Sequence, residues 1–159
     1  MSIMIRPYAT ADRPVVVALV HELNLFEDAI SGDRAKDLKA AEACLDSDLK
    51  RVERDGGAIV VACDGGEVVA MMAFVIDQPQ PYLRAEVGQV GWVAELVVDE
   101  RHRGQGIGTM LLEEAERLAR ANGLRRLMIG AIAGNHIARK AYERYGFRPA
   151  VIELSKDLD

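Results

Sequence analysis

The sequence has few of the residues that build disulfide scaffolds and metal sites. Its 159 positions include 2 cysteines and 3 histidines. Cys44 and Cys63 lack the C-x-x-C spacing of redox and zinc motifs, so we expect two reduced, packed thiols, as in a cytoplasmic protein. The histidines are scattered along the chain, and no spacing among them predicts a metal site.

Long apolar runs are also missing. The longest, Val68 to Ile76, has nine residues, far short of the roughly 20 that cross a bilayer. Residues 1–20 lack the charged start and unbroken apolar core of a signal peptide. The net charge of −5 argues against nucleic acid as the main partner. We therefore expect neither a membrane nor a nucleic acid among the partners.

The composition is that of an ordinary globular protein. Half of the residues are hydrophobic and 28% are charged. A chain of 159 residues is long enough to bury one proper core. The sequence contains no internal repeat, low-complexity tract or linker. We therefore expect residues 1–159 to form a single domain.

Apolar periodicity and turn residues divide the chain into alternating strands and helices. They predict a strand at 3–7, a helix at 12–23, a loop at 24–32, a helix at 33–54, a hairpin of strands 58–63 and 67–76, a loop at 77–89, a strand at 92–98, a helix ending at 121, a strand at 125–132, a helix at 135–145 and a last strand at 150–156. The strands before and after the helix ending at 121 should be parallel, because a helical crossover joins them. The order predicts an α/β fold with a mixed sheet.

The most informative stretch is a strand, a glycine-rich turn and the start of a helix, from Trp92 to Thr109. Gly104, Gly106 and Gly108 come directly before the periodic apolar residues of that helix. A helix N-terminus offers unpaired N–H groups that attract anions, and glycines let the backbone approach a phosphate closely. The stretch predicts a cradle for a diphosphate.

The glycine spacing separates several kinds of cradle. The Walker sequence Gly-Lys-Ser/Thr is absent, and so is the G-x-G-x-x-G of dinucleotide-binding folds. A strand ending in an acid about 20 residues later is absent too, which disfavours a nicotinamide-dependent enzyme. Residues 103–108 read R-x-x-G-x-G instead. From this stretch alone, a tight turn without a ligand remains the alternative.

A second motif makes the assignment more specific. Residues 135–147 read N-x-x-A-x-x-x-Y-E-x-x-G-F, and Asn135 and Tyr142 lie on nearly the same face of the expected helix. Together with R-x-x-G-x-G after a strand ending Glu-Leu-Val-Val, this resembles the GNAT superfamily of acetyl-CoA-dependent N-acetyltransferases. The resemblance implies a mixed, mostly antiparallel sheet (α/β, or α+β in some schemes) whose central parallel βαβ unit splays apart to admit coenzyme A.

The resemblance also implies where coenzyme A binds. Its pantetheine arm would pair with the backbone of Leu96, Val97 and Val98 like an extra strand. Asn135 would contact that arm, and Tyr142 would lie near the thioester sulfur. The diphosphate would take backbone N–H groups around these residues: Arg103, Gly104, Gln105, Gly106, Gly108 and Thr109.

Acetyl transfer to an amine needs a base for the ammonium and a proton donor for the departing thiolate. Glu95 is the candidate base, directly or through a water, and Tyr142 the candidate acid, with direct attack in a ternary complex as the simpler mechanism. Strict alternation would put Glu95 on the face of Val93 and Val97. The alternatives are a salt-bridged or water-lined Glu95 and a core Tyr142 whose hydroxyl is satisfied.

The acceptor is the least determined part of the function. Glu22, Glu27 and Asp28 could attract a cationic amine, so we hypothesise a small amine or an amino-acid derivative. A protein lysine or N-terminus is the second hypothesis, and a non-catalytic acyl-CoA-binding or sensor module is the rival from another class. After Phe147 there is room for one terminal strand where many superfamily members have a hairpin. The sheet edge left open would then be covered by a second subunit, which predicts a homodimer.

Overall fold

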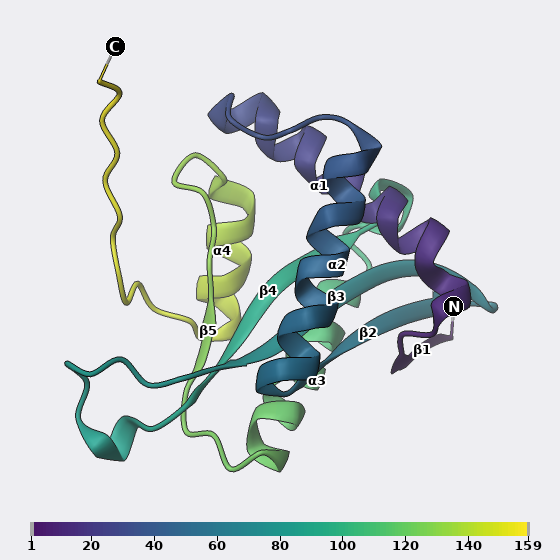
Figure 1. Ribbon diagram of the computed structural model, residues 1–159. Helices are drawn as coiled ribbons and strands as arrows, with labels where there is room; N and C mark the ends of the chain where they lie inside the picture. The colour runs from purple at the N-terminus through teal and green to yellow at the C-terminus, as the bar shows by residue number, and fades with distance from the viewer. Residues whose placement is uncertain (1, 159) are drawn as a thin grey trace.

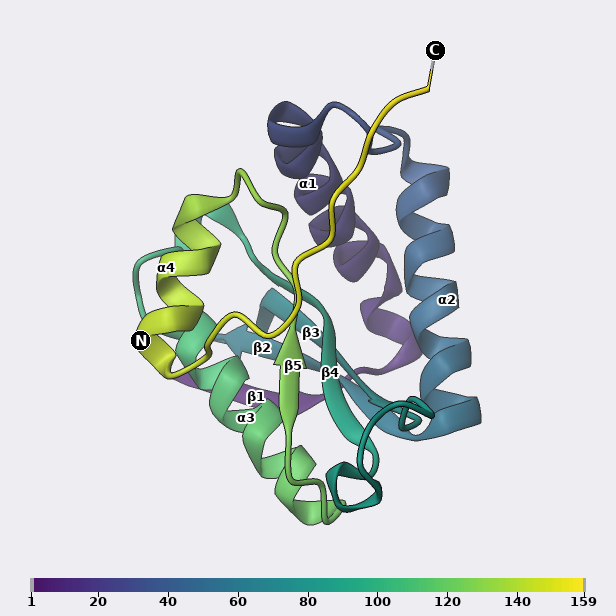
Figure 2. The same ribbon diagram turned by 90° about the vertical axis from the view of Figure 1, so that its left-hand side faces the viewer.

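Figures 1 and 2 show the computed structural model, which describes residues 2–158. Three short 3₁₀ turns, η1 (Thr10–Asp12), η2 (Ala85–Val87) and η3 (Glu100–His102), lie between the main elements. The helices and strands follow in this order: β1 (Ile3–Pro7), α1 (Arg13–Ser31), α2 (Leu38–Asp55), β2 (Gly57–Asp64), β3 (Glu67–Asp77), β4 (Val90–Val98), α3 (Ile107–Ala121), β5 (Leu127–Ile129) and α4 (His136–Tyr145).

The five strands form one mixed sheet in the order β1-β2-β3-β4-β5. The first four strands pair antiparallel, and β4 pairs with β5 in parallel. The parallel pair is joined through α3, so the predicted mixed sheet with a central βαβ unit is confirmed. The predicted hairpin of β2 and β3 is confirmed as well.

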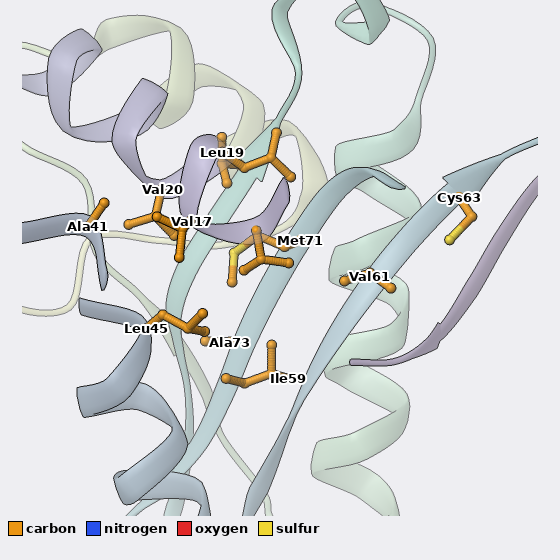
Figure 3. Packing of buried hydrophobic residues seen from close by; sticks show 12 residues of the cluster. Val17, Leu19, Val20, Ala41, Leu45, Ile59, Val61, Cys63, Met71 and Ala73 are labelled. Carbon is orange, nitrogen blue, oxygen red and sulfur yellow. The ribbon is translucent and has the colours of Figure 1, made fainter. Parts of the chain in front are cut away.

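The helices cover both faces of the sheet. Figure 2 shows α1 and α2 on one side and α3 and α4 on the other. In Figure 3, Val17 and Val20 of α1 and Leu45 of α2 point toward Met71 and Ala73 of β3. The alternate residues of the strand point the other way: Met72 and Phe74 pack with Ile107, Leu111 and Ala115 of α3. Both faces of β3 are therefore buried, which explains its unbroken apolar sequence.

Helix α1 is longer than the sequence predicts. The loop expected over 24–32 is wrong up to Ser31, because α1 continues to that residue and ends at Gly32. Gly32 has a left-handed φ of 70°, and its N–H donates to Asp28 O at 2.8 Å. The loss of apolar periodicity at Asn24 does not stop a helix, whereas a left-handed glycine does. Helix α2 then begins at Leu38, after Asp37 accepts a capping bond from the N–H of Ala40.

The last strand predicted by the sequence does not form. Over 150–156 the described chain has no regular structure and runs away from the body of the molecule (Figures 1 and 2). Val151, Ile152 and Leu154 are 73%, 81% and 93% exposed. These apolar side chains therefore pack against no surface that would stabilise a strand. β5 is also shorter than the expected 125–132.

Candidate active site

A bulge in β4 determines where Glu95 points. Ala73 of β3 pairs with Glu95, but the next residue, Phe74, pairs with Val93, so Ala94 is the extra residue. Opposed residues of paired strands share a face. Glu95 therefore faces α1 and α2, as Ala73 does. The predicted face is right for Val97 and wrong for Val93, which packs with Phe74 under α3, because strict alternation takes no account of a bulge.

Glu95 is a mostly buried carboxyl surrounded by charge of its own sign. Burial, together with the negative charges of Asp48 and Glu27, raises its pKa from 4.5 to about 8, and Arg34 opposes that shift. No ion pair to Glu95 is formed within residues 2–158. The salt-bridged alternative for Glu95 is thus without support, and the carboxyl has the proton affinity that a general base for an amine needs.

Asp48 on α2 is a member of this site that sequence reasoning missed. It is 6% exposed, and its Oδ2 has no hydrogen-bond partner among the described residues. Burial raises the pKa of Asp48 to about 6, while Arg51 acts against that shift. A signal was present in the sequence. Asp48 interrupts the apolar stripe of α2 between Leu45 and Val52, where the helix faces the sheet.

The three acids that the sequence singled out all have partners. Glu22 pairs with Arg103, Glu27 accepts from Arg34 Nε at 2.9 Å, and Asp28 lies 3.6 Å from Lys36 Nζ. These pairs give each of the three acids a cationic partner from the chain itself. We call Glu27, Asp48 and Glu95 the acidic cluster, and Arg34 is the cation bonded to it.

Helix α4 brings Tyr142 to the same place. Burial raises the pKa of Tyr142 to about 12, and the charges of Glu27 and Glu95 contribute to the shift, so the phenol lies near both carboxyls. Its ring packs edge-on against Phe147 with centroids 6.1 Å apart. Asn135 caps α4 by accepting from the N–H of Ala138 at 3.1 Å. Two distant motifs thus place an acid and a phenol together.

The sheet is split beside these groups. β4 stays paired with β3 as far as Val98, but it pairs with β5 only from Gly91 to Val93. The β4 backbone of Leu96, Val97 and Val98 therefore has no strand on its β5 side. Unpaired strand edges present N–H and C=O groups to any extended ligand that lies along them.

The glycine-rich turn opens α3 at the end of the split strand. Gly104 and Gly106 have φ values of 74° and 83°, which side-chain-bearing residues avoid. The first helical bond runs from Met110 N to Gly106 O at 3.1 Å, so the N–H groups of the preceding turn point forward without helical acceptors. Gly108 differs from these two glycines, because its φ does not require glycine. A Cβ added at Gly108 would meet nothing within 4 Å. The backbone at Gly108 therefore borders open space at the N-terminus of α3, where helix N–H groups attract anions.

Arg103 lies in this turn, but its side chain is directed toward α1. Its guanidinium pairs with Glu22, donates from Nε to Val98 O at 3.0 Å and lies 5.8 Å from the centre of the Phe26 ring. Gln105 Nε2 donates to Arg101 O at 3.4 Å. The Arg103 side chain therefore links the turn to α1. Only the backbone N–H of Arg103, and not its guanidinium, is then available to an anion.

Within residues 2–158, no group of three or more histidine, cysteine and acidic side chains could hold a metal ion. No helix there is long and apolar enough to cross a membrane. Cys44 and Cys63 are both free thiols.

Known proteins with similar sequences are acetyltransferases. The Uncharacterized N-acetyltransferase YycN of Bacillus subtilis (strain 168) is 33% identical over 70 residues, so the match spans 44% of this chain and 45% of that protein. The L-methionine sulfoximine/L-methionine sulfone acetyltransferase of Pseudomonas aeruginosa is 29% identical over 148 residues, 92% of this chain and 81% of that protein.

A solved structure and a family model complete the comparison. A predicted acetyltransferase with acetyl-CoA from Clostridium acetobutylicum has the same fold, with a TM-score of 0.74 and 17% identity over 98% of this chain and 96% of that one. The family model for the acetyltransferase (GNAT) family matches residues 21–147, which include the bulged strand, the glycine-rich turn and α4. The chain therefore belongs to the GNAT family of acetyltransferases and is an acyltransferase.

Proposed function

We propose that residues 1–159 form a single N-acetyltransferase domain that moves the acetyl group of acetyl-CoA to a primary amine of a small molecule. The observation that carries this proposal is the convergence of Glu95 and Tyr142, from β4 and α4, beside the split between β4 and β5. The split would hold the acyl donor, and the acidic cluster, of which Glu95 is a member, would receive the amine.

The residues present fit coenzyme A, which supplies the acetyl thioester when bound. We assign its diphosphate to the backbone of Arg103, Gly104, Gln105, Gly106, Gly108 and Thr109. The free edge of Leu96, Val97 and Val98 would pair with the pantetheine arm. Asn135 lies at the start of α4, 9% exposed, and its side-chain amide would reach the arm from that helix.

Glu95 and Tyr142 would move the two protons of the reaction. The Glu95 carboxylate, directly or through a water, takes a proton from the ammonium, and the freed nitrogen lone pair attacks the thioester carbonyl carbon. A backbone N–H of Val97 or Val98 would donate to the carbonyl oxygen as it gains charge. Tyr142 gives its hydroxyl proton to sulfur as the C–S bond breaks, and the second proton of the attacking nitrogen passes to the Tyr142 oxygen, directly or through a water, which restores the phenol. A phenol with a pKa of about 12 remains protonated, and so able to donate, throughout the working range.

Two observations favour a small acceptor. The related Pseudomonas protein is named for two amino-acid derivatives, methionine sulfoximine and methionine sulfone. The base of this protein is also mostly buried, on the face of the sheet that α1 and α2 cover, which suits a small molecule better than a lysine within a folded protein. A protein lysine or N-terminus is the second candidate, and a non-catalytic acyl-CoA-binding module is the third.

Release of free thiol from acetyl-CoA tests the proposal. The purified protein should release thiol when small amines are added, and calorimetry should register coenzyme A binding. Glu95→Gln and Tyr142→Phe should each lower kcat by about 10²–10⁴-fold, while coenzyme binding persists. Glu42→Gln, an exposed acid of α2, is the matched control and should behave as the wild type. Coenzyme binding without thiol release for any amine or peptide would favour the binding module.

We also propose that the protein acts in the cytoplasm as a homodimer. Its two free thiols suit a reducing compartment. β5 offers an open edge next to the site, and open edges are commonly covered by a second chain. Light scattering at increasing concentration should give twice the monomer mass, and a constant monomer mass would refute the dimer.

A further inference from the structure

We propose that the acceptor carries two cationic groups, and that Asp48 binds the one that is not acetylated. The protein would then prefer diamines and polyamines to monoamines of the same length. This inference rests on the proposed function and narrows its substrate class. It is carried by the position of Asp48 within the acidic cluster.

The first step of the argument is the place of Asp48 in the fold. It lies on the inner face of α2, one turn after Leu45, which is fully buried against the sheet. It is 6% exposed, and no donor from the described residues reaches its Oδ2. Buried carboxylate oxygens in proteins are almost always hydrogen-bonded, so an unpartnered one marks a place where a donor from outside belongs.

The second step is the charge around Asp48. Glu27, Asp48 and Glu95 come from α1, α2 and β4, and the negative charges of Asp48 and Glu27 both act on the Glu95 carboxyl. The cations nearby are already committed. Arg34 donates to Glu27 at 2.9 Å, and Arg51 donates to Asp77 Oδ1 at 2.9 Å. Arg34 thus neutralises Glu27, and no cation among the described residues is bonded to Asp48, which keeps an excess negative charge beside Glu95.

The third step matches that excess to a ligand. Glu95 would take a proton from the ammonium group that reacts, so the reacting amine becomes neutral. Asp48 would remain ionised beside it, and a buried charge without a partner is costly. A second ammonium on the acceptor would supply both the missing donor and the missing positive charge. An acceptor carboxylate would meet repulsion from the same groups.

The test compares four-carbon acceptors that differ only in the second group. The wild-type protein and acetyl-CoA are assayed with 1,4-diaminobutane, 4-aminobutan-1-ol, butylamine and 4-aminobutanoate. We expect kcat/KM for the diamine to exceed that for the amino alcohol by about 10–100-fold, the range of a charged hydrogen bond. The amino acid should be the poorest acceptor. This comparison needs no mutant.

Asp48→Asn then assigns the preference to a residue. The variant should lower the ratio of diamine to amino-alcohol kcat/KM by at least about tenfold, whereas Glu42→Gln on the outer face of the same helix should keep the wild-type ratio. Equal wild-type rates with all uncharged and charged second groups would overturn the inference and leave the acetyltransferase proposal standing. A diamine preference unchanged in a folded Asp48→Asn variant would overturn the role of Asp48. Thiol release with none of the amines or peptides would instead refute the proposed function.

Discussion

At the scale of single residues, the carboxyl of Glu95 holds its proton unusually firmly. It is mostly buried, and Asp48 and Glu27 add their own negative charge to its surroundings. The value of about 8 is reached although Arg34 pulls in the opposite direction. Both the rate and the stability of the protein should therefore depend on pH in the range where most soluble proteins are assayed.

The rate should rise with pH up to about 8. Glu95 acts as a base only when ionised, so kcat/KM should increase about tenfold per pH unit below its pKa and level off above it. The measurement is a pH profile with an amine whose own pKa lies well above the range. Asp48→Asn removes a charge that raises the Glu95 pKa, so its profile should level off at lower pH. An identical midpoint in both proteins would contradict this account.

Stability should change with pH in the opposite sense. In the unfolded chain Glu95 loses its proton near 4.5, but in the folded chain near 8, so the folded state holds the extra proton between those values. Its contribution to stability is present below 4.5 and is lost as pH rises toward 8. Glu95→Gln should melt at a higher temperature than the wild type at pH 8, with a smaller difference at pH 4.5. A variant that melts below the wild type at pH 8 would count against the buried charge.

At the scale of elements, the start of α3 separates glycines needed by the backbone from one that leaves space. Gly106 has a φ of 83°, and alanine there should cost about 1–2 kcal/mol. Gly108 has no such requirement and no neighbour within 4 Å of its added Cβ. The two positions therefore test whether the turn is built for its own fold or for a ligand.

Gly108→Ala should stabilise the protein and weaken its coenzyme. Alanine is the better helix former by about 0.5–1 kcal/mol, so Tm should rise slightly. The new methyl group would occupy the space that we assign to phosphate, and we expect coenzyme A to bind about tenfold or more weakly by calorimetry. Gly106→Ala, in contrast, should lose both stability and affinity. Unchanged affinity in a folded Gly108→Ala variant would move the diphosphate elsewhere.

At the scale of the whole molecule, the chain after Phe147 contributes little to the fold. Phe147 itself stacks on Tyr145 at 5.9 Å, and the Tyr145 hydroxyl donates to Glu116 of α3 at 3.0 Å. These contacts join α4 to α3. Beyond Phe147, the described residues are exposed through Leu158.

Removing residues 151–159 should therefore leave the monomer fold intact. We expect the Tm of the truncated protein to stay within about 1 °C of the full chain, because the removed backbone is solvent-exposed. Phe147→Ala is the contrasting change, since loss of a half-buried aromatic contact should lower stability by about 1–3 kcal/mol. A large loss of Tm on truncation would mean that the segment packs on the body of the protein in solution.

The sequence predicts the architecture well, and it locates the strand, the turn and the helix that carry the candidate site. Regular patterns and glycines predict the sheet, the turn before α3 and helix α4, because these depend on local chemistry. The bulge at Ala94 depends on the register between two strands, which no local pattern encodes. The missing partner of Asp48 and the pairing of Arg103 with Glu22 depend on three-dimensional neighbours in the same way. The terminal strand was wrong because strand propensity alone does not provide a surface to pair with.

The split between β4 and β5 should make the stability of the folded protein depend on the concentration of its ligand. Beyond Val93 the two strands stop sharing hydrogen bonds, so whatever occupies the gap completes the sheet. A ligand that binds only the folded state adds about 2.7 kcal/mol when present at a hundred times its dissociation constant. If coenzyme A fills the gap, the protein should be degraded more slowly in a cell with a high concentration of coenzyme A than in a cell with a low one. The rate at which the protein is degraded would then follow the cellular concentration of coenzyme A, with no separate sensor protein.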